Sequence, residues 1–214
     1  DESGLLVGAI TIDDAMNVLD EELEEDILRL AGVSEESSLS DRILDTTRGR
    51  FVWLFVNLLT AILASYVISM FQDEINALVA LAVLMPIVAS MGGNAGTQSM
   101  TVAVRALATR ELTGKNARRV LWREVVVGML NGAAFGIIMS LVVAFWFGVP
   151  MLAVVIAIAM MLTLAAAAFA GIVLPLALDR MGVDPALASG PFVTTVTDVV
   201  GFFAFLGLAA LIVL

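Results

Sequence analysis

Five long apolar stretches constrain this chain more than any other feature. They are expected near Phe51–Phe71, Ile75–Leu107, Ala117–Phe147, Met151–Leu178 and Ala186–Leu214. Each is long enough to cross roughly 30 Å of hydrocarbon as an α-helix, and a helix satisfies its own backbone polar groups where no water can. We therefore predict an all-α polytopic membrane protein, with five transmembrane helices over residues 51–214 and the lipid bilayer as its surroundings.

The basic residues predict how these spans are oriented. If the amino terminus is cytoplasmic, all eleven Lys and Arg residues lie in or beside segments on the cytoplasmic side. The turns expected outside, Gln72–Glu74 and Gly148–Pro150, contain none. Positive residues concentrate in cytoplasmic loops. We therefore predict a multi-pass protein of the cytoplasmic membrane, with its carboxyl terminus outside.

The segment before the first span is acidic. Residues 1–47 hold fourteen Asp or Glu and two Arg, a net charge of −12, whereas the remainder carries +2. Leu5–Thr11 is expected to be a strand, and the following helix to be capped by Asp13 or Asp14. One strand and one helix bury too little surface to fold alone, so we expect the chain to start inside a larger cytoplasmic domain. Residues 1–33 would end that domain.

Residues 34–50 are expected to connect this acidic head to the membrane. Gly32–Ser40 is interpreted as a linker, and Asp41–Thr47 as a short helix that leads into the first span.

Asp198 is the only carboxylate in the last apolar stretch. A charged side chain at bilayer depth costs roughly 2.5–3.5 kcal/mol on insertion scales, so it is retained mainly where it faces water, a partner or an ion. Gly190, Thr194 and Asp198 recur every fourth residue and form one line on a helix. We interpret this line as the acidic lining of a cation path. The alternative is a carboxylate that is hydrogen-bonded to a neighbouring helix and only stabilises packing.

A second polar stripe runs through the second apolar stretch. On a helix its members fall on one face: Ser90, Asn94, Gln98, Thr101 and Arg105. Such a stripe is costly in a membrane unless it lines water or pairs with another stripe. The alternative is helix packing, because Gly92 and Gly96 form a small-xxx-small pair. Beside the Asp198 line, a shared aqueous path explains both features.

The composition limits the chemistry. The chain has no histidine and no cysteine, so a cation must be bound by oxygen, which favours hard ions such as Mg²⁺, Ca²⁺ or Mn²⁺. An intramembrane aspartyl protease would need two carboxylates that share a proton, but Glu124 and Asp179 lie near span ends. We expect neither an enzyme nor a nucleic-acid partner.

Several motifs resemble the MgtE magnesium channels. The first is Pro-x5-Gly-Gly-Asn-x-Gly-x-Gln, from Pro86 to Gln98. The second lies in the last span, as Asp184-Pro185-Ala186 and Pro191-x6-Asp198 followed by Gly201. The head, Leu6-Val7-Gly8-Ala9-Ile10-Thr11 followed by Asp13-Asp14, resembles the closing strand and helix of a CBS domain. The similarity covers essentially the whole chain, in order.

The resemblance implies a homodimer with five spans per subunit and a pore on the two-fold axis, between the second and fifth spans. The residue at the position of Asp198 would face its symmetry mate and hold a largely hydrated Mg²⁺. Positions that match Ser90, Asn94, Gly190 and Thr194 would surround that ion. The acidic head, with further cytoplasmic domains of the same chain, would sense cytosolic Mg²⁺ through residues that match Asp14, Glu22, Glu25 and Asp26.

The expected function is therefore a magnesium-selective channel that moves Mg²⁺ down its electrochemical gradient and closes when cytosolic Mg²⁺ is plentiful. The same oxygen ligands would accept Mn²⁺ or Ca²⁺. The alternative function is an ion-coupled secondary transporter of divalent cations, although five spans do not divide into two equal inverted halves.

Overall fold

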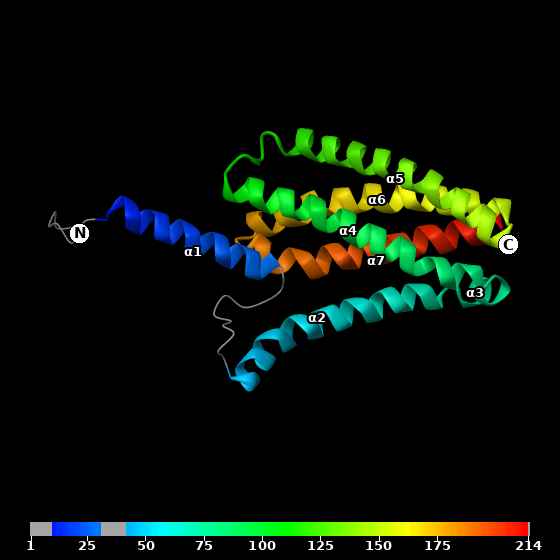
Figure 1. The fold of residues 1–214 in the computed structure, drawn as a ribbon, viewed down its shortest axis with the longest axis horizontal. Coiled ribbons are helices and arrows are strands. Elements are labelled where there is room, and N and C mark those ends of the chain that lie inside the picture. Colours follow the sequence, from blue (N-terminus) through cyan, green and yellow to red (C-terminus); the bar gives the residue numbers. More distant parts are fainter. Residues whose placement is uncertain (1–9, 31–41, 214) are drawn as a thin grey trace.

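Every regular element that the structure describes is an α-helix. The computed structural model describes residues 10–30 and 42–213, leaving out several side chains of the first helix and those of residues 187 and 188. In chain order the helices are α1 (Ile12–Leu30), α2 (Ile43–Ser69), α3 (Gln72–Ala77), α4 (Ala80–Ala108), α5 (Ala117–Phe147), α6 (Pro150–Arg180) and α7 (Pro185–Ile212) (Figure 1). Five of them, all but α1 and α3, are long and apolar enough to cross a membrane. The predicted five-span, all-helical fold is confirmed.

Two predicted boundaries are wrong. The second span begins at Ala80 rather than Ile75, because α3 ends at Ala77 and the extended backbone of Leu78 (φ −139°, ψ 88°) separates the two helices. The short helix expected at Asp41–Thr47 is not separate either: α2 begins at Ile43 and continues into the first span without a break. No proline interrupts it there, and the single Gly49 is tolerated inside the helix. The predicted strand, Leu5–Thr11, lies mostly outside the described residues, and the predicted linker, Gly32–Ser40, lies wholly outside them.

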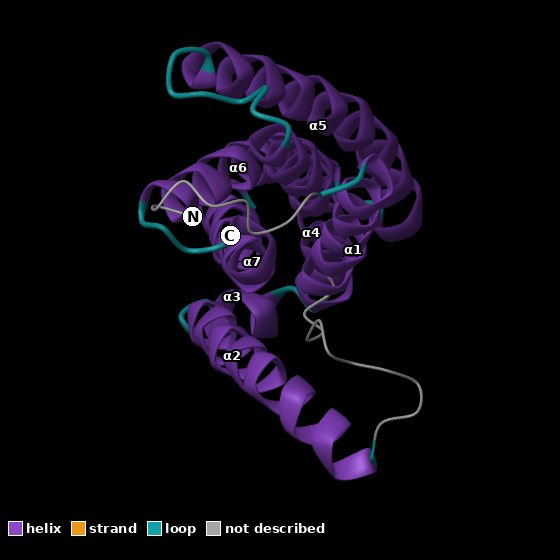
Figure 2. Ribbon diagram, turned by 90° about the vertical axis from the view of Figure 1, so that its left-hand side faces the viewer, coloured by secondary structure: helices purple, strands orange, loops and turns teal. Residues whose placement is uncertain are grey.

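Helix α6 forms the centre of the bundle. In Figure 2 it lies between α5 on one side and α4 and α7 on the other. In the 18-residue apolar segment of α6, 56% of the residues are buried, compared with 11% in the corresponding segment of α2. Its fully buried side chains include Val155, Ile156 and Met160, which pack in one cluster with Leu84 of α4 and Phe205 of α7. This central helix sets the positions of α4 and α7.

Helix α2 lies at the edge of the bundle. Its buried residues are Ala64 and Val67, both near its carboxyl end, and its main neighbour is α7. The amino-terminal half leans away from the other spans (Figures 1 and 2) and exposes residues such as Phe51 and Leu58. A helix that is apolar on all sides but little buried needs lipid or another chain to cover it.

The basic residues of the spans gather at one end of the bundle. The amino-terminal ends of α2 and α5 and the carboxyl-terminal ends of α4 and α6 lie at that end (Figure 1). Arg105 and Arg180 occupy the last turns of α4 and α6. The opposite end holds α3, whose first turn contains Asp73 and Glu74. The basic residues that are separated along the sequence therefore lie together at one end of the bundle.

Candidate ion-binding site

Helix α7 carries the Asp198 line. Asp184 caps this helix, since its Oδ1 accepts a hydrogen bond from the backbone N–H of Ala186 at 2.8 Å. The Thr194 hydroxyl donates to the carbonyl oxygen of Gly190 at 3.1 Å. Thr194 is exposed, and a Cβ added at Gly190 would meet no atom within 4 Å. The line therefore runs along a side of α7 that the described residues of one chain leave open.

Asp198 is partly buried, and nothing in the described part of the chain donates a hydrogen bond or forms an ion pair with its carboxylate. The preceding residue behaves differently. Thr197 is fully buried, and its hydroxyl donates to the carbonyl oxygen of Thr194 at 2.9 Å. A carboxylate that only stabilised packing would need a donor from a neighbouring helix, and the described residues of one chain supply none.

The polar stripe of α4 is also open. Its members are exposed in the single chain: Ser90, Asn94, Gln98, Thr101 and Arg105. Asn94 and Gln98 line a groove of about 380 Å³, which Asn131 of α5 completes. This groove does not include Asp198. The stripe and the Asp198 line thus lie on neighbouring helices that pack together, but the groove that Asn94 lines does not reach Asp198 among the described residues of one chain.

The glycines of the same motif face the other way. A Cβ added at Gly92 would lie 2.7 Å from Cγ2 of Thr163 on α6, and one at Gly96 would lie 2.6 Å from Cγ1 of Val193 on α7. Both glycines are buried. The packing interpretation therefore holds for these two glycines, while Asn94 between them is exposed and stays outside the contact.

Comparison with known proteins identifies the family. Residues 85–208, which run from α4 to α7 and include Asn94 and Asp198, match the family MgtE, described as a divalent cation transporter. The chain belongs to the MgtE family. The resemblance drawn from the motifs is confirmed, and a family of transporters agrees with the expectation that the chain is not an enzyme.

Three MgtE relatives match nearly the whole chain, and each is named magnesium transporter MgtE. The relative from Thermus thermophilus is 37% identical over 214 residues, which cover 99% of this chain and 47% of the relative. That from Bacillus subtilis is 33% identical over 209 residues, covering 98% and 46%. That from Enterococcus faecalis is 35% identical over 206 residues, covering 96% and 45%. The chain spans about half the length of these relatives.

One polar contact in this MgtE chain was not predicted from the sequence. The Ser99 hydroxyl of α4 donates to Oε2 of Glu124 on α5 at 3.3 Å. Both residues line a small pocket of about 110 Å³, together with Gln98 and Asn131. Glu124 was set aside because it lies near a span end. Its spacing of seven from Asn131, which puts both on one face of a helix, was the signal that could have found it.

The acids of the head have their own local structure. Thr11, not Asp13 or Asp14, caps α1: the backbone N–H of Asp14 donates to Oγ1 of Thr11 at 3.1 Å. Oδ2 of Asp14 accepts in return from the N–H of Thr11 at 3.0 Å and from its hydroxyl at 2.7 Å. This is a capping box. The Thr11 hydroxyl, helped by the Thr11 N–H, holds the pKa of Asp14 below its usual value.

Of the other three predicted regulatory acids, the structure describes the side chain of only one. Glu25 is partly buried in α1, and the side chains of Glu22 and Asp26 lie outside the described residues. Among the side chains that are described, no group of three or more acids could hold a metal ion. A regulatory site in the head therefore remains a prediction.

Proposed function

We propose that this protein is a magnesium-selective channel, in which Mg²⁺ passes down its electrochemical gradient beside Asp198. One observation supports this proposal most: Asp198 is a carboxylate on a membrane-spanning helix, partly buried, without a protein partner in the described part of the chain. A cost of roughly 2.5–3.5 kcal/mol needs an offsetting interaction. A divalent cation with its water shell supplies one, and the relatives are named for magnesium transport.

A second copy of the chain would complete the site. Two Asp198 carboxylates that face each other on a two-fold axis repel unless a cation lies between them. Mg²⁺ gives up its waters reluctantly, so the pair would hold a largely hydrated ion through hydrogen bonds. A homodimer would also cover the polar stripe of α4, which one chain leaves open.

The residues around the axis would supply neutral oxygen ligands and hydrogen-bond partners to the water shell. In this proposal they are the Asn94 amide, the hydroxyls of Ser90 and Thr194, and the open backbone side at Gly190. Mn²⁺ and Ca²⁺ accept the same ligands, so discrimination among these ions would depend on the width of the path and on the cost of removing water.

The head would act as the regulator on the cytoplasmic side. Helix α1 packs against α7 (Figure 1), and Leu30 at its end contacts the cluster formed by Met100, Val104, Ala186 and Val193. Divalent ions that draw the acids of α1 together would thereby move the start of α7, thirteen residues before Asp198. Asp14 would contribute through Oδ1, since its Oδ2 is held by Thr11.

Magnesium flux into vesicles that contain the reconstituted protein tests the proposal. Asp198→Asn should lower the flux at least roughly tenfold, which corresponds to about 1.4 kcal/mol, while the protein still assembles. Asp73→Asn, which changes an exposed acid of α3, is the matched control and should keep the flux. An unchanged flux in Asp198→Asn would contradict the pore assignment.

The regulatory part has its own test. In a protein that includes the remaining cytoplasmic domains, we expect Glu22→Gln, Glu25→Gln and Asp26→Asn together to keep the channel open at high cytosolic Mg²⁺. Closure at the same Mg²⁺ concentration as the unmodified protein would remove these acids from the sensor.

Electrical recordings separate a channel from an ion-coupled transporter. Transporter sites use helices that are broken near the midplane, whereas α4 and α7 continue through Pro86 and Pro191. We therefore expect ohmic single-channel currents. Saturating flux with a fixed stoichiometry to Na⁺ or H⁺ would instead establish the coupled transporter.

A further inference from the structure

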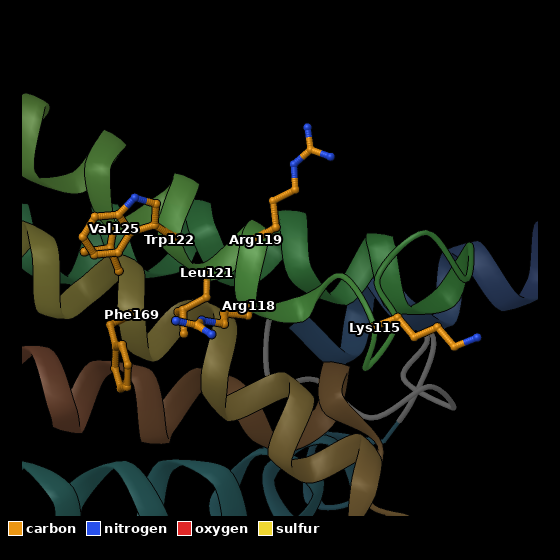
Figure 3. Close-up of a pocket in the computed structure, with 7 residues that line it drawn as sticks. All are labelled: Lys115, Arg118, Arg119, Leu121, Trp122, Val125 and Phe169. Atoms are coloured by element: carbon orange, nitrogen blue, oxygen red, sulfur yellow. The ribbon is translucent and has the colours of Figure 1, made fainter.

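An open pocket of about 800 Å³ lies at the basic end of the bundle, between the start of α5 and helix α6 (Figure 3). Three of its lining residues are basic: Lys115, Arg118 and Arg119. The others are apolar: Leu121, Trp122, Val125 and Phe169. Helix α5, which supplies five of the seven lining residues, lies on the far side of α6 from α7 (Figure 2). The pocket is therefore separate from the Asp198 line on α7.

No described acidic residue neutralises the positive charge of this pocket. No acidic side chain lines it. In the parts of the chain that the structure describes, the side chains of Lys115, Arg118 and Arg119 form neither an ion pair nor a hydrogen bond. Another base lies close by, because Nη2 of Arg180 would be 3.8 Å from a Cβ added at Gly114 in the neighbouring loop. An anionic group would therefore be attracted here.

The apolar residues continue from the bases toward the membrane interior. Trp122 and Val125 follow Arg118 by four and seven positions on α5, roughly 6 and 10 Å further along the helix axis. Trp122 is 69% exposed, and Phe169 of α6 is 49% exposed. In Figure 3 the Arg118 side chain lies between the two helices, whereas Arg119 points outward at the rim. Tryptophan is enriched at this depth, where headgroups meet acyl chains.

We propose that this pocket binds an anionic membrane phospholipid. Its phosphate would interact with Arg118 and Arg119, and one acyl chain would lie along Trp122, Val125 and Phe169. Basic pockets between spans on the cytoplasmic side bind such headgroups, and guanidinium pairs with phosphate in a two-pronged geometry. Charge at the mouth and apolar walls below match a lipid better than a soluble anion. This inference does not depend on how the protein conducts ions.

Fluorescence quenching provides the test, because the chain holds only three tryptophans. Trp53→Phe with Trp146→Phe leaves Trp122 as the reporter in the full chain, reconstituted into phosphatidylcholine vesicles. We expect phosphatidylglycerol with brominated acyl chains to quench Trp122 more strongly than equally brominated phosphatidylcholine. Arg118→Gln should weaken the apparent affinity for the anionic lipid roughly fivefold, the effect of one basic residue near a charged surface.

The control is Arg123→Gln, which removes the same charge from the same helix at a position that does not line the pocket; it should leave the affinity unchanged. Arg119→Gln, at the exposed rim, is the second variant if Arg118→Gln does not fold. Equal quenching by both lipids, or no effect of either pocket variant, would overturn the proposal. Loss of quenching with excess inorganic phosphate would assign the pocket to a soluble anion, and no quenching by any lipid would mean that protein covers Trp122.

Discussion

The two faces of α4 differ in what they contact. One face, with Gly92 and Gly96, is buried against α6 and α7 so closely that a methyl group would overlap neighbouring side chains. The other face, with Ser90, Asn94 and Gln98, is open in the single chain. Both faces come from one short motif. Between helices in a membrane there is no hydrophobic driving force, so close packing of small residues holds them together, and this leaves the polar face available for water or an ion.

Helix α5 makes the same kind of close contact through its glycines. Gly128, Gly132 and Gly136 recur every fourth residue, and a Cβ added at any of them would lie within 2.7 Å of the backbone of α6. Buried glycines in this protein thus set the distances between helices, whereas the partly buried carboxylate of Asp198 finds no partner among the described residues of one chain.

The largest effect on stability is expected where buried glycines contact a neighbouring helix. Gly132→Ala should destabilise the protein by about 1–3 kcal/mol, because the new Cβ would lie 2.6 Å from Cα of Met161, a backbone atom that cannot rotate away. Gly93→Ala is the matched control, since nothing lies within 4 Å of its Cβ position. Thermal unfolding in detergent measures both. Equal stability of the two variants would contradict the distinction between the faces.

The open face should respond in selectivity rather than in stability. Asn94→Ala should change unfolding by less than about 0.5 kcal/mol and should shift the ratio of Mg²⁺ to Ca²⁺ or Mn²⁺ flux by up to roughly tenfold, or 1.4 kcal/mol. Asn57→Ala, an exposed amide on the peripheral α2, controls for the loss of an amide. A large loss of stability in Asn94→Ala would show that the amide serves packing instead.

Thr163 of α6 tests the buried contact between α6 and the glycine face of α4. It is fully buried beside Gly92 and Gly201, and its hydroxyl has no hydrogen-bond partner among the residues that the structure describes. An unsatisfied buried polar group costs about 1–3 kcal/mol, so Thr163→Val should stabilise the protein by about 1 kcal/mol and leave the flux unchanged. A loss of Mg²⁺ flux in this variant would mean that the dry face also takes part in conduction.

The smallest effect is expected for an acid that already has a partner. Thr11→Val should raise the pKa of Asp14 toward its ordinary 3.8. Because the pKa of Asp14 is lowered in the folded state, the ionised carboxylate stabilises α1 when the pH is above the ordinary pKa. This stabilisation is lost as the pH falls below the ordinary pKa and through the lowered one. Thr11→Val should weaken that pH dependence, because the hydroxyl is lost while the backbone N–H of residue 11 can still donate to Asp14. NMR titration of the Asp14 carboxyl group provides the measurement, and an unchanged pKa would contradict the role of the capping box.

Much of this architecture was accessible from the sequence, and the misses have physical causes. Helix α5 was predicted with its observed bounds, because Gly148 follows a continuous apolar run. The break at Leu78 was missed because apolar composition continues across it and only the backbone angles change. The Thr11 cap was missed because Asp13 and Asp14 satisfy the same preference. The roles of Asp198 and Asn94 in binding an ion stay predictions.

Three properties could be derived from the sequence alone: that the chain crosses a membrane, which helix ends carry positive charge, and which polar residues share a helix face. Each of them follows from local composition and helical periodicity. Only the tertiary structure decided which face of α4 is dry and that Ser99 meets Glu124 across two helices. It also showed that Asp198 finds no donor among the described residues of one chain. Those outcomes depend on how far apart the helix backbones lie, and that distance is set jointly by glycines on α4 and α5 and by the side chains of α6 and α7 against which they pack.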